Sequence, residues 1–194
     1  MNVAIVKYNA GNIRSVINSV RRFGIEPVVT DRGDELSSAD RVIFPGVGEA
    51  SSAMEYLRSK KLDTAIRSLS QPVLAICLGM QLLGTYSDEN ETSCLAIAPF
   101  EVKRFRVDGL KVPHVGWNNI LALHSPLFAG VAENSRMYFV HSYFVERTTE
   151  TIADTVYGAA FCAAVKHENF YGVQFHPEKS GLVGARILEN FLRL

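Results

Sequence analysis

Short apolar runs alternate with helix-spaced apolar residues through the first half of the chain. Four short runs are predicted to be strands: 3–6, 26–30, 41–44 and 73–76. The last has four consecutive apolar residues, which fit a strand covered on both faces. Between them, apolar residues recur at helical spacing: Ile13, Val16, Ile17 and Val20; Ala50, Ala53, Met54 and Leu57; Leu62, Ala65, Ile66 and Leu69. Repeated strand and helix units of this length predict an α/β fold, a mostly parallel sheet with helices on both faces, in which ligands bind at the carboxyl ends of the strands.

The pattern changes in the second half, after a polar stretch at 87–93 that we expect to be a surface loop. Five segments then have strand composition with few helices between them: 100–107, 136–145, 151–157, 159–167 and 170–175. This half is therefore predicted to add antiparallel or mixed strands. A final helix is expected from about Gly181, with Ser180 as its N-cap and an inner face made by Ile187, Asn190, Phe191 and Leu194.

Composition narrows the function classes. The chain has 194 residues, 47% of them hydrophobic, which is enough for one domain over 1–194. Twenty basic and twenty acidic side chains cancel, so nothing indicates capture of nucleic acid or of an anionic membrane. Three cysteines without a CxxC pair argue against a disulfide framework and a zinc knuckle. With no signal segment at the start and no membrane-length apolar stretch, we expect a cytoplasmic protein.

Cys77 stands where the run 73–76 ends and a helix begins. A thiol at that junction lies near the unpaired N–H groups of the helix start, which favour the reactive thiolate. Gly79 and the small Ala75 leave room for a tight turn, as in the strained strand-to-helix elbow that exposes a nucleophile. Taken alone, however, a cysteine in an apolar run is more often a small core residue.

A possible partner for Cys77 lies at the end of the last predicted strand. Pro177 restricts His176 to extended geometry, and in an extended chain Glu178 then points to the same side as His176. An imidazole oriented by a carboxylate is a base and acid for a thiol nucleophile. The alternative is that His176 only ends a strand and Glu178 is a solvated start to the last helix.

A glycine-bearing turn follows the run 41–44. Gly46 and Gly48 allow the backbone to approach a ligand closely, and N–H groups there, together with that of Leu78, are suited to an oxyanion hole. An isolated Pro-Gly turn would otherwise be structural.

These motifs together resemble a known family. "PGVG", "AICLGMQLLG" and "FHPE", in that order and at these separations, are similar to the class I (triad) glutamine amidotransferases. "YNAGNIRSV", "PHVGWN", "YFVHSY" and "YGVQFHPEKSG" further resemble the glutaminase subunits of imidazole glycerol phosphate synthase, over essentially the whole chain. The resemblance implies a flavodoxin-like α/β fold, a mostly parallel mixed sheet with helices on both faces and an extra antiparallel region in the C-terminal half.

The resemblance also implies roles for individual residues. Cys77 would attack the side-chain amide of glutamine, with His176 as acid and base and Glu178 as its orienter. The glutamyl thioester would then be hydrolysed to glutamate. The oxyanion hole would be the N–H groups of Val47 and Leu78, and the residues that hold glutamine would be Gln81, Ser142 and Tyr143. No metal or organic cofactor is implied.

A partner protein is implied as well. In this family ammonia passes to a (βα)8-barrel cyclase, the other half of a heterodimer in histidine biosynthesis. Trp117 and Lys179 match positions at that interface, although a lone tryptophan could equally belong to the core. Asn12 matches a third, although it could also cap the first helix.

Two alternatives remain beside this interpretation. Another triad amidotransferase, such as the glutaminase of anthranilate synthase or of pyridoxal phosphate synthase, is disfavoured by "PHVGWN" and "FVHSY". A noncatalytic binding subunit is disfavoured because all three triad positions are filled. One departure is Ala75, where the family usually has glycine, so we expect the turn to be slightly crowded there. Cys94 and Cys162 lack useful partners and are predicted to be core or loop residues.

Overall fold

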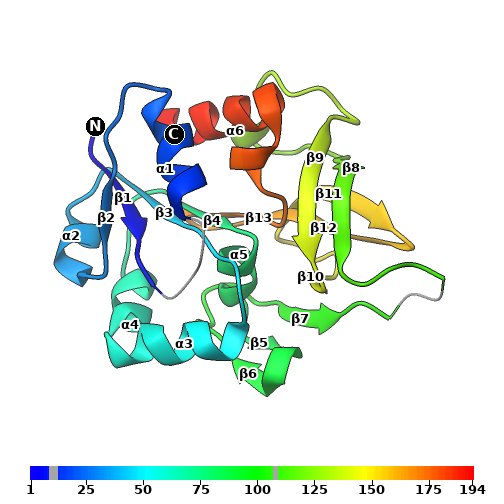
Figure 1. Cartoon of the computed structure of the whole chain (residues 1–194), viewed down its shortest axis with the longest axis horizontal. Coiled ribbons are helices and arrows are strands. Elements are labelled where there is room, and N and C mark those ends of the chain that lie inside the picture. The colour runs from blue at the N-terminus through cyan, green and yellow to red at the C-terminus, as the bar shows by residue number, and fades with distance from the viewer. Residues whose placement is uncertain (9–12, 107–108) are drawn as a thin grey trace.

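A seven-stranded sheet runs through the middle of the computed structural model, which describes residues 1–8, 13–106 and 109–194 (Figure 1). Its strand order is β11-β12-β13-β4-β3-β1-β2. The strands are β1 (Val3–Val6), β2 (Val28–Thr30), β3 (Arg41–Phe44), β4 (Val73–Ile76), β11 (Thr151–Tyr157), β12 (Ala159–His167) and β13 (Phe170–Val173). The pairs from β13 to β2 are parallel, whereas β11 with β12 and β12 with β13 are antiparallel. The predicted mixed, mostly parallel sheet is confirmed.

Helices cover both faces of this sheet. On one side lie α1 (Ile13–Arg21) and α6 (Gly181–Arg193), and on the other lie α3 (Ala50–Ser59) and α4 (Leu62–Arg67) (Figure 1). The helix α5 (Leu78–Leu82) directly follows β4, and α2 (Gly33–Ser37) follows β2. We did not predict α2, because a five-residue helix is too short to show a period.

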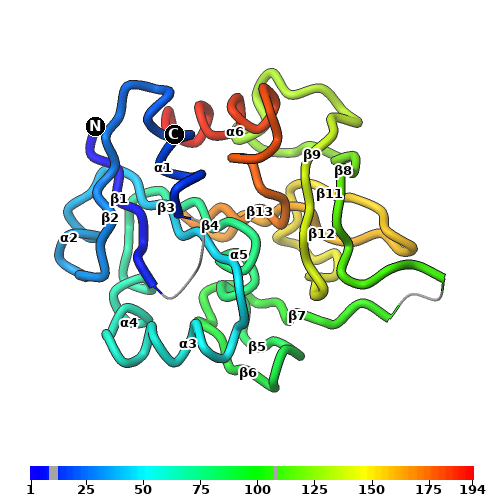
Figure 2. Tube along the Cα trace, viewed as in Figure 1, coloured from blue at the N-terminus to red at the C-terminus, as the bar shows by residue number. Residues whose placement is uncertain are grey.

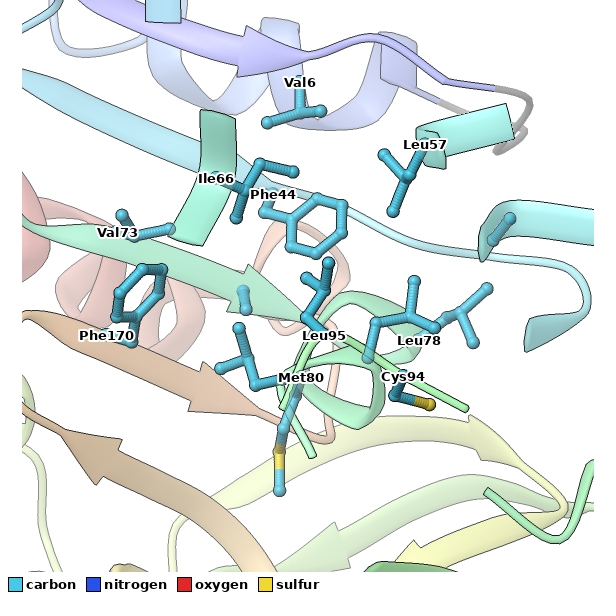
Figure 3. Close-up of a cluster of buried hydrophobic side chains, with 14 of the residues drawn as sticks. Val6, Phe44, Leu57, Ile66, Val73, Leu78, Met80, Cys94, Leu95 and Phe170 are labelled. Carbon is cyan, nitrogen blue, oxygen red and sulfur yellow. The ribbon is translucent and has the colours of Figure 1, made fainter. Parts of the chain in front are cut away.

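The alternation of side chains along the parallel strands explains the continuous apolar runs. In β1, Val3 and Ile5 join the core on the side of α1 and α6, whereas Ala4 and Val6 join the core on the side of α3 and α4. Figure 3 shows the core on the side of α3 and α4, in which Phe44 of β3 lies near Leu57 of α3 and Ile66 of α4. A strand that is buried on both faces has no polar side to reveal a period of two.

Two smaller sheets complete the second half. One has the order β10-β7-β5-β6, and the other pairs β8 with β9 in an antiparallel ribbon beside β11 (Figure 2). The strands are β5 (Tyr86–Ser87), β6 (Thr92–Ser93), β7 (Glu101–Arg104), β8 (His114–Asn119), β9 (Arg136–His141) and β10 (Tyr143–Val145). The run predicted as one strand, 136–145, is broken at Ser142, where the chain leaves one sheet for the other.

One local prediction was wrong, and a second was confirmed only in part. The segment 87–93 is not a simple surface loop, because β5, the 3-10 turn η1 (Glu89–Glu91) and β6 occupy it, and strands of two residues carry no readable pattern. Ser180 occupies the predicted N-cap position of α6, and its carbonyl accepts from the Gly184 N–H at 3.1 Å, but its side chain does not cap the helix. Its hydroxyl donates to the His176 carbonyl at 2.7 Å and accepts from the Tyr138 N–H at 3.0 Å, so it fastens the segment before the helix to β9.

The last helix otherwise follows its predicted inner face. Ile187 and Phe191 are buried, and Asn190 donates to the carbonyls of Leu127 and Ala129 beside η2 (Pro126–Phe128). In the described part of the chain no helix combines the length and the apolar character needed to cross a bilayer.

Candidate active site

Three neighbouring parallel strands deliver the candidate residues to one edge of the sheet. The Pro-Gly turn follows β3, Cys77 follows β4, and Gln174 and His176 follow β13, in the spatial order β3-β4-β13. A cavity of about 310 Å³ lies over this edge. Its walls are Val47, Gly48, Cys77, Leu78, Gln81, Glu89, Pro113, Val140, His141, Ser142, Tyr143, His176 and Lys179. The structure therefore brings together the predicted nucleophile, its base and the residues expected to hold a substrate.

Cys77 sits on a strained turn. Its φ of 54° lies in a region that a non-glycine residue rarely adopts, between β4 and α5. The turn is held because the Cys77 N–H donates to the Val173 carbonyl at 2.7 Å and the Cys77 carbonyl accepts from the Gln81 N–H at 3.1 Å. A Cβ at Gly79 would lie 2.1 Å from the Phe44 carbonyl oxygen, so only glycine fits there. This is the geometry of a nucleophile elbow.

The unusual Ala75 lies away from that strain. It is fully buried within β4, opposite Phe44 of β3 and Gly172 of β13. The positive φ falls on Cys77 itself, two residues further on.

His176 and Glu178 form a buried pair. The imidazole Nδ1 lies 2.9 Å from the Glu178 carboxylate, and both side chains are almost fully buried. His176 has the extended geometry expected before a proline, but Glu178 lies in the 3-10 turn η3 (Pro177–Lys179). The predicted contact is thus present, while the expected extended chain is wrong: the turn brings the carboxylate back to the ring.

The charges around His176 favour its protonated form. Burial by itself would lower the pKa of His176, but the Cys77 thiolate and the Glu178 carboxylate outweigh it and raise the pKa to about 10. A thiolate beside an imidazolium combines a ready nucleophile with a proton for a leaving group.

The sulfur also contacts an amide that the sequence patterns did not single out. The Cys77 thiol donates to the Val140 carbonyl at 3.6 Å and accepts from Nε2 of Gln174 at 3.6 Å. Gln174 is fully buried and accepts from Nε2 of Gln81 at 2.9 Å. Gln81 in turn donates to the Tyr143 carbonyl at 2.9 Å. Gln174 lies within the motif "YGVQFHPEKSG", but motif position alone does not reveal a contact with sulfur.

The turn after β3 is in contact with the elbow. The Leu78 N–H donates to the Gly46 carbonyl in a long bond of 3.4 Å, and the Tyr8 hydroxyl donates to the Pro45 carbonyl at 2.6 Å. Burial, together with the Cys77 thiolate, holds the pKa of Tyr8 well above its usual range, so it remains a donor. Since the carbonyl and the N–H of a trans peptide point in opposite directions, the Val47 N–H points away from Leu78 in this conformation.

Glu89 is a further acidic residue on the cavity wall. Its carboxylate accepts from the Ala50 N–H at 2.7 Å at the start of α3, and burial raises its pKa. The sequence prediction missed it because it lies in the polar segment that we expected to be a loop.

Two of the predicted interface residues, Trp117 and Lys179, lie near the ring of Tyr138. Trp117 is 47% exposed, which excludes the core alternative, and its ring lies 6.0 Å from that of Tyr138. The Lys179 ammonium lies 6.0 Å from the centre of the Tyr138 ring and lines the cavity. Asn12 lies outside the described residues.

Two buried histidines contact each other where His141 lines the cavity. Nδ1 of His114 lies 3.0 Å from Nε2 of His141, and Nδ1 of His141 lies 2.7 Å from the Tyr143 carbonyl. His114 also stacks on Tyr157 at 4.0 Å. Within 1–8, 13–106 and 109–194, no three His, Cys, Asp or Glu side chains come together in a way that could hold a metal ion.

Comparison with known proteins agrees with this geometry. The family model "Glutamine amidotransferase class-I" matches residues 4–194. "Imidazole glycerol phosphate synthase subunit HisH" of Bacteroides fragilis is 52% identical, and that of Escherichia coli strain K12 is 44% identical, each over the full length of both chains. A solved structure from Thermoplasma acidophilum, described as a "putative gmp synthase subunit a protein", has a TM-score of 0.78 at 19% identity. The match covers all of this chain and 93% of that one, which shows a common fold. The chain therefore belongs to the class I glutamine amidotransferases and, within them, to the HisH subunits of imidazole glycerol phosphate synthase.

Proposed function

We propose that this protein hydrolyses glutamine at Cys77 and delivers the ammonia to a cyclase subunit in histidine biosynthesis. The observation that carries the proposal is the strained Cys77 at the carboxyl end of β4, with His176 in the same cavity and Glu178 buried against it. Backbone strain at a cysteine and a carboxylate buried beside a histidine both cost stability, and a noncatalytic subunit would gain nothing in return.

The reaction follows from the charges of the three residues. The Cys77 thiolate attacks the side-chain carbonyl carbon of glutamine to form a tetrahedral oxyanion. His176 gives its proton to the amide nitrogen, the C–N bond breaks, and ammonia leaves a glutamyl thioester. His176, now neutral, takes a proton from water, which attacks the thioester and releases glutamate and the Cys77 thiolate. Glu178 holds the ring in place and stabilises the imidazolium in both steps.

The cavity walls supply the groups that fit the other end of glutamine. Both hydrogens of the Gln81 amide are donated to protein acceptors, so Gln81 can offer only its oxygen to a ligand. That oxygen and the Glu89 carboxylate fit an α-ammonium group. Ser142 and Tyr143 line the same cavity.

The oxyanion hole needs a change in the turn after β3. Rotation of the Gly46–Val47 peptide would remove the carbonyl from the Leu78 N–H and point the Val47 N–H toward the same place. Gly48, at φ 114°, already has a conformation that side chains rarely adopt and is free to take up such a change. We propose that docking of the cyclase stabilises the rotated peptide, with Trp117 and Lys179 in the interface and Asn12 as a third contact.

The decisive experiment mixes the purified chain with the cyclase subunit of imidazole glycerol phosphate synthase and measures glutamate formation. We expect negligible glutaminase activity from the chain alone, strong stimulation by the cyclase with its nucleotide ligand, and no activity from the Cys77→Ser complex. Full activity of that variant would overturn the triad. Failure to bind the cyclase in a pull-down, with stable binding to another synthase, would overturn the partner. Cytoplasmic localisation is part of the same proposal.

A further inference from the structure

Gln174 connects the nucleophile to a glutamine-binding residue through buried hydrogen bonds. It follows β13, two residues before His176, and its side chain has no exposed surface. Its Nε2 lies 3.6 Å from the Cys77 sulfur, and its Oε1 lies 2.9 Å from Nε2 of Gln81. The amide thus fills the space between the reacting atom and the cavity wall.

The orientation of both amides follows from one backbone carbonyl. The Tyr143 carbonyl can only accept, so Gln81 must turn its NH2 group toward it, and the second hydrogen of that group meets Gln174. Gln174 must therefore present its oxygen to Gln81. Its own NH2 group is then left facing the sulfur.

The sulfur needs such a donor when it is ionised. The Val140 carbonyl, 3.6 Å away, accepts from the thiol but would repel a thiolate. Besides the His176 ring, the Gln174 N–H is the donor that the described residues direct at this atom. The Gln174 side chain is fully buried and hydrogen-bonded to Gln81, so its N–H is already oriented toward the sulfur before a substrate binds. Little free energy is therefore needed to reorient it during the reaction.

We propose that Gln174 is a catalytic residue with two effects. Its N–H stabilises the Cys77 thiolate, and its oxygen holds Gln81 so that only the Gln81 oxygen faces the ligand. The first effect concerns the sulfur alone, whereas the second rests on the proposed glutaminase function.

Two substitutions separate the two effects. Gln174→Glu keeps the oxygen that accepts from Gln81 but loses the donor to sulfur when the carboxyl is ionised. Gln174→Leu keeps the approximate volume and loses both groups. Gln71→Leu is the matched control, since the Gln71 amide donates to the Leu36 carbonyl at 2.8 Å before β4, at the end opposite Cys77.

The first measurement is the pH dependence of Cys77 alkylation by iodoacetamide on the purified chain, with the modified cysteine identified by mass spectrometry. We expect the pH midpoint to rise by about one unit in Gln174→Leu and at least as much in Gln174→Glu, and to stay unchanged in Gln71→Leu. The other titratable groups around the sulfur are His176 with Glu178 behind it, Tyr8 and His141. Glu89 and Lys179 line the same cavity, and these variants leave all of these groups in place. Unchanged midpoints in variants with wild-type circular dichroism would overturn the donor role.

The second measurement is glutaminase kinetics of the complex with the cyclase. We expect kcat to fall in both position-174 variants by about tenfold or more, and KM for glutamine to rise several-fold only in Gln174→Leu. An equal KM in wild type and Gln174→Leu would overturn the positioning of Gln81. Alkylation requires neither glutamine nor a partner, so the donor role can be refuted even if the proposed reaction is wrong. If Gln174→Leu does not fold, the isosteric Gln174→Glu still tests the donor.

Discussion

The buried histidine pair makes a sharp prediction about acid stability. The Tyr143 carbonyl accepts from Nδ1 of His141, so Nε2 of His141 is an acceptor and Nδ1 of His114 donates to it. Both rings are neutral in this arrangement. Burial lowers the pKa of His114 to about 4 and that of His141 to about 3. We consider His114→Phe, which keeps a ring to stack on Tyr157 but removes one of the two imidazoles.

The direction of the change in unfolding free energy with pH follows from the histidine pKa values in the folded and unfolded states. A histidine in the unfolded chain titrates near pH 6.5, above both folded values, so the stability associated with the neutral pair is present above pH 6.5 and is lost as the pH falls toward 4 and 3. Between pH 7.5 and pH 5.0 each histidine lowers the free energy of unfolding by about 2 kcal/mol. His176 has the opposite sign: its contribution is complete below pH 6.5 and is lost as the pH rises toward 10. Because wild type and His114→Phe both contain His176, its contribution cancels when their free energies of unfolding are compared.

Urea denaturation at pH 7.5 and at pH 5.0 measures the difference. We expect the loss of unfolding free energy between these pH values to be about 2 kcal/mol smaller in His114→Phe than in wild type. The variant should also be less stable at pH 7.5 by about 1–3 kcal/mol, because Nε2 of His141 loses its donor. Tyr157→Phe is the control: it removes a hydroxyl that donates to the Lys111 carbonyl but no imidazole, so its loss should equal that of wild type. An equal loss in His114→Phe would refute the neutral pair.

Three further outcomes follow from the same structure. Gly79→Ala should prevent native folding, since its Cβ would lie 2.1 Å from the Phe44 carbonyl oxygen, and circular dichroism melts would show it. Trp117→Ala should lower the unfolding free energy by only about 1–2 kcal/mol, because the residue is 47% exposed and loses only part of its packing area, yet weaken cyclase binding about tenfold or more in calorimetry. Burial raises the pKa of Cys94 and of Cys162 to about 12, so native protein at pH 8 should take up one alkyl group and protein in urea three.

The parallel half of the fold was predictable because its period is strong. Strands of four apolar residues and helices with apolar residues three and four apart leave few other arrangements, and β1, β3 and β4 lie within the predicted segments. The elements that we did not predict are too short for a period to repeat: α2 and the two-residue strands β5 and β6. The break at Ser142 was hidden for another reason: apolar residues continue on both sides of it, although the chain changes sheets there.

The site was predictable where residues lie in local motifs. Cys77 and the His176–Glu178 pair each stand at a strand end with a turn-forming neighbour, so their chemistry can be inferred from a few consecutive letters. Gln174 and Glu89 were missed because the contacts behind their proposed roles join residues 97 and 39 positions apart in the chain. Such pairings arise only when the sheet brings β4 beside β13 and α3 beside η1.

The elbow shows how the fold maintains an unfavourable conformation for chemistry. A non-glycine residue with the φ of 54° and ψ of −110° found at Cys77 costs about 1–3 kcal/mol, and glycine at position 77 would avoid much of this cost. The cost is tolerated because Cys77 is bonded on both sides, to Val173 of β13 and to Gln81 of α5, while Gly79 lets α5 approach the end of β3. A change of the Cys77 backbone to a relaxed conformation would break the hydrogen bond from the Cys77 N–H to the Val173 carbonyl of β13. The same sheet edge that fixes His176 and Gln174 therefore also holds the Cys77 sulfur at the wall of the cavity, so the strain and the alignment of the candidate reacting groups depend on the same hydrogen bonds.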